Sequence, residues 1–159
     1  MRTTLEYVEP QPRFYDGWRA LYGVYGDDMG DPVDDVIALS VWSWLLGGTH
    51  RVAAILAVDR DGGVVGFVHY RPFPRTLHAN EACFLDDLYV APDHRGRGIA
   101  AELVRRVCEV AAENGWTEVR WVTGSSNAVA QRLYERIATR MELITYRIPL
   151  KRPTDSNAP

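Results

Sequence analysis

The chain has 159 residues, of which 47% are hydrophobic and 25% charged, as in an ordinary globular protein. The formal net charge of −3 argues against general nucleic-acid binding, which needs a basic face. No apolar run approaches the roughly 20 residues that span a bilayer. The two cysteines, Cys83 and Cys108, have no metal-ligand spacing, so no metal is expected and a reducing, cytoplasmic location fits best. We expect one domain over residues 1–150 and a disordered tail over 151–159.

The N-terminal part of the chain predicts one strand and two helices. Residues 3–8 alternate between polar and apolar side chains, and Pro12 begins a helix with an aromatic face. Asp31 is expected to cap the second helix, because Pro32 follows it. That helix ends at Gly47-Gly48.

The centre of the chain predicts three strands. The apolar runs 52–58 and 64–70 flank Asp61-Gly62-Gly63, which is a hairpin signal. Residues 71–74 contain two prolines and are expected to break the ladder before the next strand, over 82–90.

The C-terminal part predicts a helix over 99–115, a strand over 119–123, a helix over 125–138 and a last strand over 142–150. The whole order is then β-α-α-β-β-β-α-β-α-β. It predicts a mixed sheet with helices on both faces.

The segment 88–100 is the most informative functional pattern. An apolar strand end is followed by a loop that contains Arg95, Gly96, Arg97 and Gly98, and the loop leads directly into a helix. Loop amides and a helix N-terminus together form a region of positive potential that suits a pyrophosphate. Glycine lets the backbone approach the ligand, and the arginines can add charge-assisted hydrogen bonds. The segment predicts a site for a phosphorylated cofactor.

Residues 96–101 also match the dinucleotide-binding fingerprint formally. That fingerprint has its first glycine in the turn right after a strand, whereas residues 91–95 intervene here. No acidic residue closes the following strand, where a ribose contact is needed. A dinucleotide-dependent oxidoreductase is therefore the weaker interpretation.

The loop reads arginine-x-x-glycine-x-alanine over residues 95–100, and Asn127, Ala130 and the pair Leu133-Tyr134 follow in that order after a strand. This combination resembles the acyl-coenzyme A loop and downstream motif of the Gcn5-related N-acetyltransferase (GNAT) superfamily. The resemblance spans roughly residues 5–150.

Two further segments, 69–74 and 121–123, are most similar to the histone/polyamine N-acetyltransferase branch of that superfamily. One departure is that Ala138 and Thr139 stand where the superfamily often has glycine and phenylalanine. The usual terminal hairpin is therefore expected to be abbreviated.

The resemblance implies an α/β (α+β mixed) fold with a central mixed sheet of about seven strands and helices on both faces. It also implies acetyl-coenzyme A as cofactor. A splayed sheet would leave backbone amides near Leu88 and Tyr89 free for the pantetheine arm and the thioester oxygen. Asn127 would bond the arm, unless it serves only as an N-cap. The residues expected to bind the cofactor are Leu88, Tyr89, Val90, Arg95, Gly96, Arg97, Gly98, Ile99, Ala100 and Asn127.

Two catalytic residues are implied as well. Tyr134 would be the general acid that protonates the departing thiolate, its alternative being a half-buried tyrosine with a core hydrogen bond. Asp86 and Asp87 lie where family members often keep a carboxylate that acts as a base. Strand alternation is expected to direct their side chains to opposite faces, so that at most one faces the reaction. Asp86 is the predicted base, and pairing with a nearby arginine is its alternative.

The implied function is acetyl-coenzyme A-dependent N-acetylation of a primary amine, which attacks the thioester directly in a ternary complex. Five aspartates between positions 27 and 35 favour a small cationic acceptor such as a polyamine, an amino acid or a lysine-like amine. They could instead form only a solvated loop and a helix cap. A non-catalytic acyl-coenzyme A-binding sensor is the alternative function. No nucleic-acid or membrane partner is expected, and the edge of the last strand would allow a homodimer.

Overall fold

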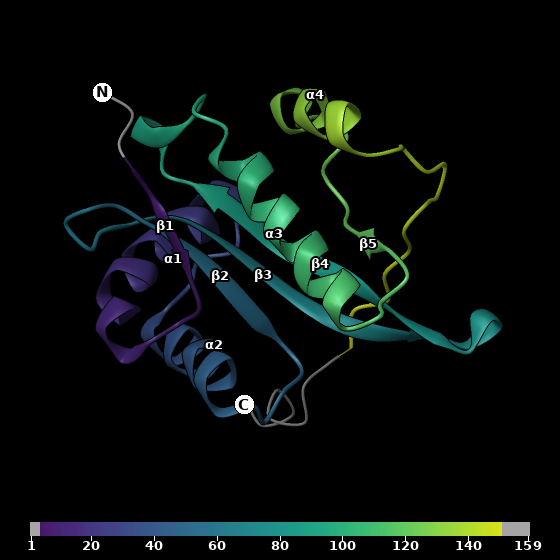
Figure 1. Ribbon diagram of the computed structural model, residues 1–159, viewed down its shortest axis with the longest axis horizontal. Helices are drawn as coiled ribbons and strands as arrows, with labels where there is room; N and C mark the ends of the chain where they lie inside the picture. The colour runs from purple at the N-terminus through teal and green to yellow at the C-terminus, as the bar shows by residue number, and fades with distance from the viewer. Residues whose placement is uncertain (1–3, 151–159) are drawn as a thin grey trace, which may run out of the picture. The chain divides into compact units, whose positions relative to one another are not determined.

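The computed structural model describes residues 4–150, and the chain divides into two compact units, Met1–Gly124 and Ser125–Pro159. The expected disordered tail, 151–159, lies outside the described residues. None of the described helices is long and apolar enough to cross a membrane. The elements of the first unit (Figure 1) are β1 (Glu6–Val8), α1 (Tyr15–Met29), α2 (Asp35–Gly47), β2 (Ala53–Val58), β3 (Val64–Arg75), β4 (Asn80–Val90), α3 (Ile99–Glu113) and β5 (Val119–Arg120). The second unit contains α4 (Ala128–Ile137).

The strands of the first unit form one sheet in the order β1-β2-β3-β4-β5. Neighbours are antiparallel except β4 and β5, which are parallel, so the sheet is mixed, as expected. The prediction of about seven strands is wrong for the described residues, which contain five. The predicted strand at 119–123 is shorter, and residues 142–150 form no ladder. Alternation describes a side-chain pattern, whereas a strand also needs a partner, which the pattern does not supply.

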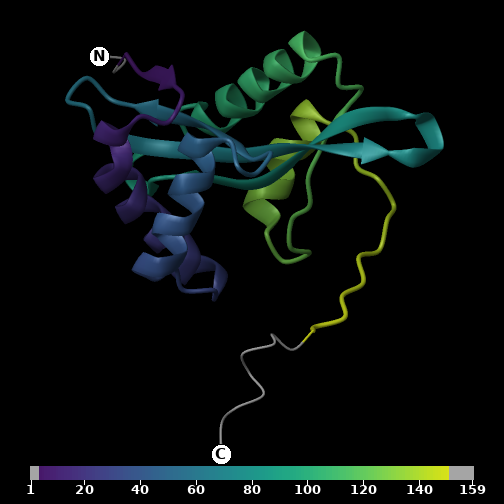
Figure 2. The ribbon, with the colours of Figure 1, turned by 90° about the horizontal axis from the view of Figure 1, so that it is seen from below.

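Helices cover both faces of the sheet in the first unit, which confirms that prediction. Figure 2 shows α1 and α2 on one side of the strands and α3 on the other. On the α1 side, the buried side chains include Trp18, Trp42 and Phe67, whereas Leu103 and Val107 of α3 belong to a separate cluster. The sheet therefore separates two cores, and the two faces of β4 have different environments.

β3 continues through its two prolines, so the predicted break at 71–74 is wrong. Pro72 pairs with Cys83 and Pro74 with Glu81 on β4. Prolines two residues apart direct their missing N–H groups toward the same strand edge. The pairing of β2 with β3 ends at Tyr70, so neither proline deprives a neighbouring strand of a hydrogen bond.

The first two helices begin slightly later than predicted. A short 3-10 turn at Pro12–Phe14 precedes α1. Asp34, not Asp31, caps α2, and its Oδ1 accepts a hydrogen bond from the Ile37 N–H at 2.8 Å. Several aspartates of this segment could serve as a cap. The choice depends on where the chain leaves its extended conformation, which composition does not determine.

Candidate active site

β4 separates from β5 well before its end. β5 pairs with only two of its residues, although β4 continues to Val90. The Ala91 N–H donates to the Val65 carbonyl of β3 at 2.9 Å. Alternation then directs the N–H groups of Leu88 and Val90 toward the edge that β5 leaves uncovered, and that of Tyr89 toward β3. Among the predicted strand residues, Leu88 and Val90 are thus placed to donate to a ligand along this edge.

The loop after β4 has the backbone geometry that a bound pyrophosphate requires. Gly96 and Gly98 have positive φ angles of 73° and 81°, which favour glycine. A Cβ at either position would meet nothing within 4 Å, so a ligand can approach the backbone closely. Gly98 is the N-cap of α3 and makes no side-chain cap hydrogen bond, which leaves the first N–H groups from Ile99 onward for an anion. The residues therefore fit the pyrophosphate of coenzyme A.

The two arginines of the loop stabilise its conformation by donating hydrogen bonds to backbone carbonyls. Arg95 Nε donates to the Val90 carbonyl at 3.0 Å, and Arg97 Nη2 donates to the Asp93 carbonyl at 2.9 Å. The Arg95 guanidinium also lies over the Tyr89 ring, 5.1 Å from its centroid. Each side chain still has donors that these bonds do not use. Each arginine can therefore stabilise the loop and contact an anion at the same time.

Three of the five aspartates in the acidic segment 27–35 have structural partners. Asp28 accepts a hydrogen bond from the Tyr89 hydroxyl and lies 4.0 Å from Arg95 Nη2, so it supports the loop between β4 and α3. Asp34 caps α2, and Asp35 pairs with Arg19 at 3.0 Å. Only two aspartates of the segment, Asp27 and Asp31, have no side-chain partner among the described residues.

A β-bulge at Asp86 overturns the expectation for the carboxylate pair. His69 pairs with Asp87 and Tyr70 with Leu85, so Asp86 is an extra residue without an opposite partner on β3. Because of this inserted residue, alternation no longer separates Asp86 from Asp87. The pKa of Tyr22 on α1 is raised to about 12. Burial contributes most to this rise, and the charges of Asp87 and Asp86 add to it. The two side chains therefore share the α1 face of the sheet.

The environments of Asp86 and Asp87 change their proton affinities in opposite directions. Burial, opposed by Arg71 and to a lesser extent by His69 and assisted by the charge of Asp87, raises the pKa of Asp86 above its ordinary value. Arg71 Nε lies 3.0 Å from Asp86 Oδ2, as the alternative interpretation of this residue anticipated. Burial also acts to raise the pKa of Asp87, but a hydrogen bond from His69, an electrostatic contribution of the same ring and a hydrogen bond from Tyr25 outweigh it and hold that pKa below its usual range. Of the two, Asp86 is therefore the better proton acceptor.

Sequence reasoning missed a buried hydrogen-bond chain beside this pair. Trp18 Nε1 donates to His69 Nε2 at 3.0 Å, and His69 Nδ1 lies 2.9 Å from Asp87 Oδ2. The Tyr25 hydroxyl donates to Asp87 Oδ1 at 2.9 Å. Two signals could have revealed the chain. Trp18 and Tyr25 are seven residues apart on one face of a helix, and His69 is the one polar side chain in an otherwise apolar strand segment, 64–70.

The remaining predicted site residues, Asn127 and Tyr134, belong to the second unit. Asn127 caps α4, because its Oδ1 accepts a hydrogen bond from the Ala130 N–H at 3.2 Å. Its backbone and amide nitrogen leave further hydrogen-bonding groups for a ligand. Burial raises the pKa of the Tyr134 hydroxyl, so this group stays protonated at neutral pH. The helix itself covers Ala128–Ile137, which is shorter than the predicted 125–138.

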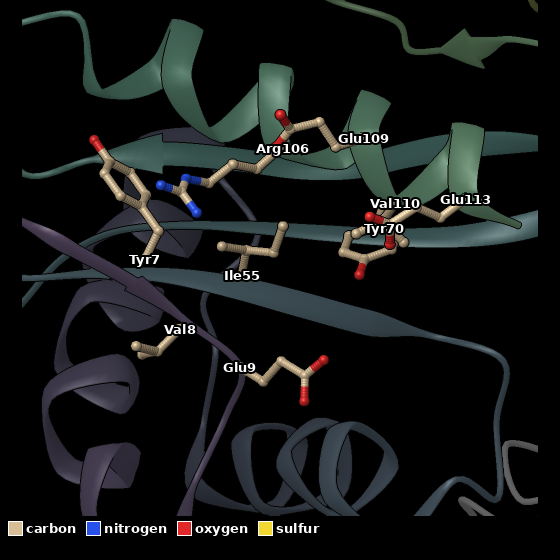
Figure 3. A pocket seen from close by; sticks show the side chains of 9 residues that line it. All are labelled: Tyr7, Val8, Glu9, Ile55, Tyr70, Arg106, Glu109, Val110 and Glu113. Carbon is tan, nitrogen blue, oxygen red and sulfur yellow. The ribbon is translucent and has the colours of Figure 1, made fainter.

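The first unit also contains a pocket of about 180 Å³ (Figure 3). It is formed by residues of β1, β2, β3 and α3, including Tyr7, Arg106 and Glu113. None of the predicted site residues lines it, and Tyr70 on its wall belongs to the core on the α3 side of the sheet. It plays no part in the candidate site.

Comparison with known proteins decides the family. Residues 16–138 match the acetyltransferase (GNAT) family, which is more than half of the chain. The chain belongs to the GNAT family. It is therefore an acetyl-coenzyme A-dependent N-acetyltransferase, and the dinucleotide interpretation is set aside.

Individual relatives of this GNAT protein act on different amines. D-amino-acid N-acetyltransferase HPA3 of Saccharomyces cerevisiae is 27% identical over 147 residues, which cover 92% of this chain and 90% of that protein. Thialysine N-epsilon-acetyltransferase of Bos taurus is 32% identical over 74 residues, which cover 46% of this chain and less than half, 43%, of the relative. The crystal structure of ribosomal-protein-alanine N-acetyltransferase from Brucella melitensis is similar with a TM-score of 0.77 and 25% identity, over 92% of this chain and 99% of that one.

Proposed function

We propose that this GNAT protein acetylates the primary amine of a small cationic molecule, such as an amino acid, a lysine-like amine or a polyamine. The observation that carries this proposal is the bulge at Asp86, which brings two carboxylates onto one face of the strand that leads into the cofactor loop. Two neighbouring carboxylates attract an ammonium group, and one of them can accept its proton. The D-amino-acid and thialysine acetyltransferases among the relatives act on amines of this kind.

The cofactor would be held by the backbone of the first unit. We assign its pyrophosphate to the loop and helix start at Arg95, Gly96, Arg97, Gly98, Ile99 and Ala100, and its pantetheine arm to the edge of β4 at residues 88–90, with Asn127 as a further contact. Backbone N–H groups at this edge are also suited to the thioester oxygen, on which negative charge develops during attack.

Two side chains would move the protons. An alkylammonium has a pKa near 10.4, so its proton must leave before or during attack. We assign that step to Asp86, directly or through a water molecule. The amine nitrogen then bonds to the thioester carbon, the carbon–sulfur bond breaks, and the Tyr134 hydroxyl protonates the thiolate. Asp86→Asn keeps the shape of the side chain and removes its ability to act as a base.

The test is a thiol-release assay with a panel of cationic, neutral and acidic primary amines. Cationic amines are expected to be the better acceptors. In Asp86→Asn, turnover should fall by roughly 10²–10⁴ while coenzyme A affinity measured by calorimetry stays the same. Asp61→Asn, an exposed aspartate in the β2–β3 turn, is the matched control. Wild-type turnover in Asp86→Asn, or a preference for acidic acceptors, would overturn the proposal.

Location and assembly follow from the same sequence. Both cysteines are free, Cys83 in the core and Cys108 exposed. We propose a cytoplasmic location for this reason, since a reducing compartment keeps thiols free. The homodimer was expected from the edge of a last strand over 142–150. Because those residues form no ladder within the chain, the dimer stays a prediction without that edge to support it.

A further inference from the structure

The buried chain from Trp18 through His69 and Asp87 to Tyr25 has no role in the reaction described above. Trp18 is fully buried, and His69 is 2% exposed. A buried polar group is costly unless each of its hydrogen-bonding atoms has a partner. Both imidazole nitrogens and both Asp87 oxygens have one here. The arrangement is therefore complete, and its donors and acceptors can be assigned one by one.

The assignment has a single solution. An indole N–H can only donate, so His69 Nε2 must accept and carries no proton. The one proton of the neutral ring is then on Nδ1, which donates to Asp87. A doubly protonated ring would set the Nε2–H against the Trp18 N–H, two donors face to face in a buried site. The Trp18 indole thus opposes protonation of His69.

We infer that Trp18 and His69 are positioning residues that hold Asp87 as an uncompensated anion beside Asp86. If His69 were an imidazolium, it would neutralise Asp87. As a neutral donor it orients the carboxylate and leaves its charge in place. The inference rests on the proposed role of Asp86, because the charge of Asp87 acts on the reaction through that residue.

The charges that face this cluster come from three elements. Tyr22 and Tyr25 of α1 face it as neutral phenols, and Arg71 of β3 pairs with Asp86. The remaining member is His69, whose charge depends on whether Nε2 carries a proton beside the Trp18 N–H. The negative charge of Asp87 makes Asp86 a stronger base, since a like charge disfavours the ionised form. A neutral His69 therefore keeps the proton affinity of Asp86 high.

The direct test is nuclear magnetic resonance of the full chain labelled with ¹⁵N-histidine. The other three histidines are replaced by glutamine, so that the remaining signals belong to His69. The expected result at neutral pH is a protonated Nδ1 and an unprotonated Nε2, as the hydrogen bonds to Asp87 and from Trp18 require. A protonated Nε2 would overturn the inference.

The functional test compares Trp18→Phe with Trp42→Phe in the otherwise unchanged chain. Both tryptophans are buried in the same cluster, but only Trp18 donates to His69. Without that donor, His69 can accept a second proton and neutralise Asp87. The acid limb of the kcat/KM profile should then shift to lower pH by about one unit, as expected for one added charge a few ångströms away. Trp42→Phe should keep the wild-type profile.

The outcomes separate this inference from the proposed function. A Trp18→Phe profile identical to that of Trp42→Phe would overturn the inference, even if Asp86→Asn is inactive. If Asp86→Asn is fully active, Asp86 is not the base, and Trp18 then has no route by which to affect the acid limb. If Trp18→Phe does not fold, the resonances of His69 with tryptophan 18 intact still decide where its proton lies.

Discussion

Asp86 and Asp87 are neighbours in sequence with opposite proton affinities, and each has a distinct set of contacts. Asp87 accepts hydrogen bonds on both oxygens, whereas Asp86 has one arginine and partial burial. The raised pKa of Asp86 predicts that activity falls on the acid side above the usual range of an aspartate, because the base must be deprotonated. The lowered pKa of Asp87 means that this residue stays charged across that limb.

The proposed general acid, Tyr134, gives the first prediction at the residue scale. Tyr134→Phe removes one hydroxyl group and keeps the ring. If Tyr134 protonates the thiolate, turnover should fall by roughly 10²–10⁴, and acetyl-coenzyme A binding should change little. Tyr146→Phe in the same unit is the control, since that side chain is 87% exposed. Stopped-flow turnover and calorimetry measure the two quantities, and unchanged turnover in Tyr134→Phe would make the residue purely structural.

The connection between β4 and α3 is the element to which we assign the pyrophosphate of the cofactor. Its glycines adopt left-handed conformations, and its arginines donate to carbonyls of the same connection. These contacts within the chain hold the conformation of the loop, which lowers the entropic cost of binding a ligand there. α3 contributes its uncapped N-terminus, while its apolar side packs on the sheet and fixes the direction in which that end points.

A substitution in this loop gives the second prediction. Gly98→Asp places a carboxylate against the proposed phosphate position, and coenzyme A affinity should fall at least tenfold, about 1.4 kcal/mol. Gly98→Ala introduces the same backbone strain without the charge and should bind more tightly than Gly98→Asp. Gly115→Asp is a second control, because Gly115 has a similar φ of 70° at the opposite end of α3. Equal affinities for Gly98→Asp and Gly115→Asp in folded protein would refute the assignment of the pyrophosphate.

At the scale of the whole molecule, the excess of negative charge is partly used within the fold. Of the five aspartates between positions 27 and 35, three have structural partners, and one of these, Asp28, supports the cofactor loop. Replacing Asp28 together with Asp27 and Asp31 would disturb the loop between β4 and α3 as well as the negative charge that attracts a cationic acceptor. Replacing only Asp27 and Asp31 tests the long-range attraction of a cationic acceptor by itself.

The third prediction concerns that pair. The double variant Asp27→Asn/Asp31→Asn should raise the KM for a diamine by about twofold to fivefold, because it removes two charges that attract cations, and leave the KM for acetyl-coenzyme A unchanged. The rise should disappear at high salt, where surface charges are screened. Asp61→Asn serves as a control of similar exposure in another part of the first unit. A KM for the diamine that does not change at low salt would show that the segment is only a solvated cap.

Local sequence signals predicted most elements and the loop, because those depend on contacts between residues close in the chain. Helix periodicity located α1, α2, α3 and α4 to within a few residues, and the arginine-glycine pattern identified the loop between β4 and α3. Glycine has a conformational role there that its neighbours do not change. The end of α2 at Gly47, with Gly48 in a left-handed conformation, was predictable for the same reason.

Pairing between distant segments decided the rest. The bulge at Asp86 exists only in the register of β4 against β3, so it reversed the prediction that Asp86 and Asp87 lie on opposite faces. The prolines of β3 are tolerated because β2 has already ended, and residues 142–150 form no ladder although their pattern is that of a strand. The Trp18–His69–Asp87 chain joins residues 51 and 18 positions apart. The sequence by itself determined the family through its motifs, and the helices and the loop between β4 and α3 through local conformation. Only the tertiary structure decided which side chains share a face and which groups lie beside the two ring nitrogens of His69, because these depend on partners that the fold supplies.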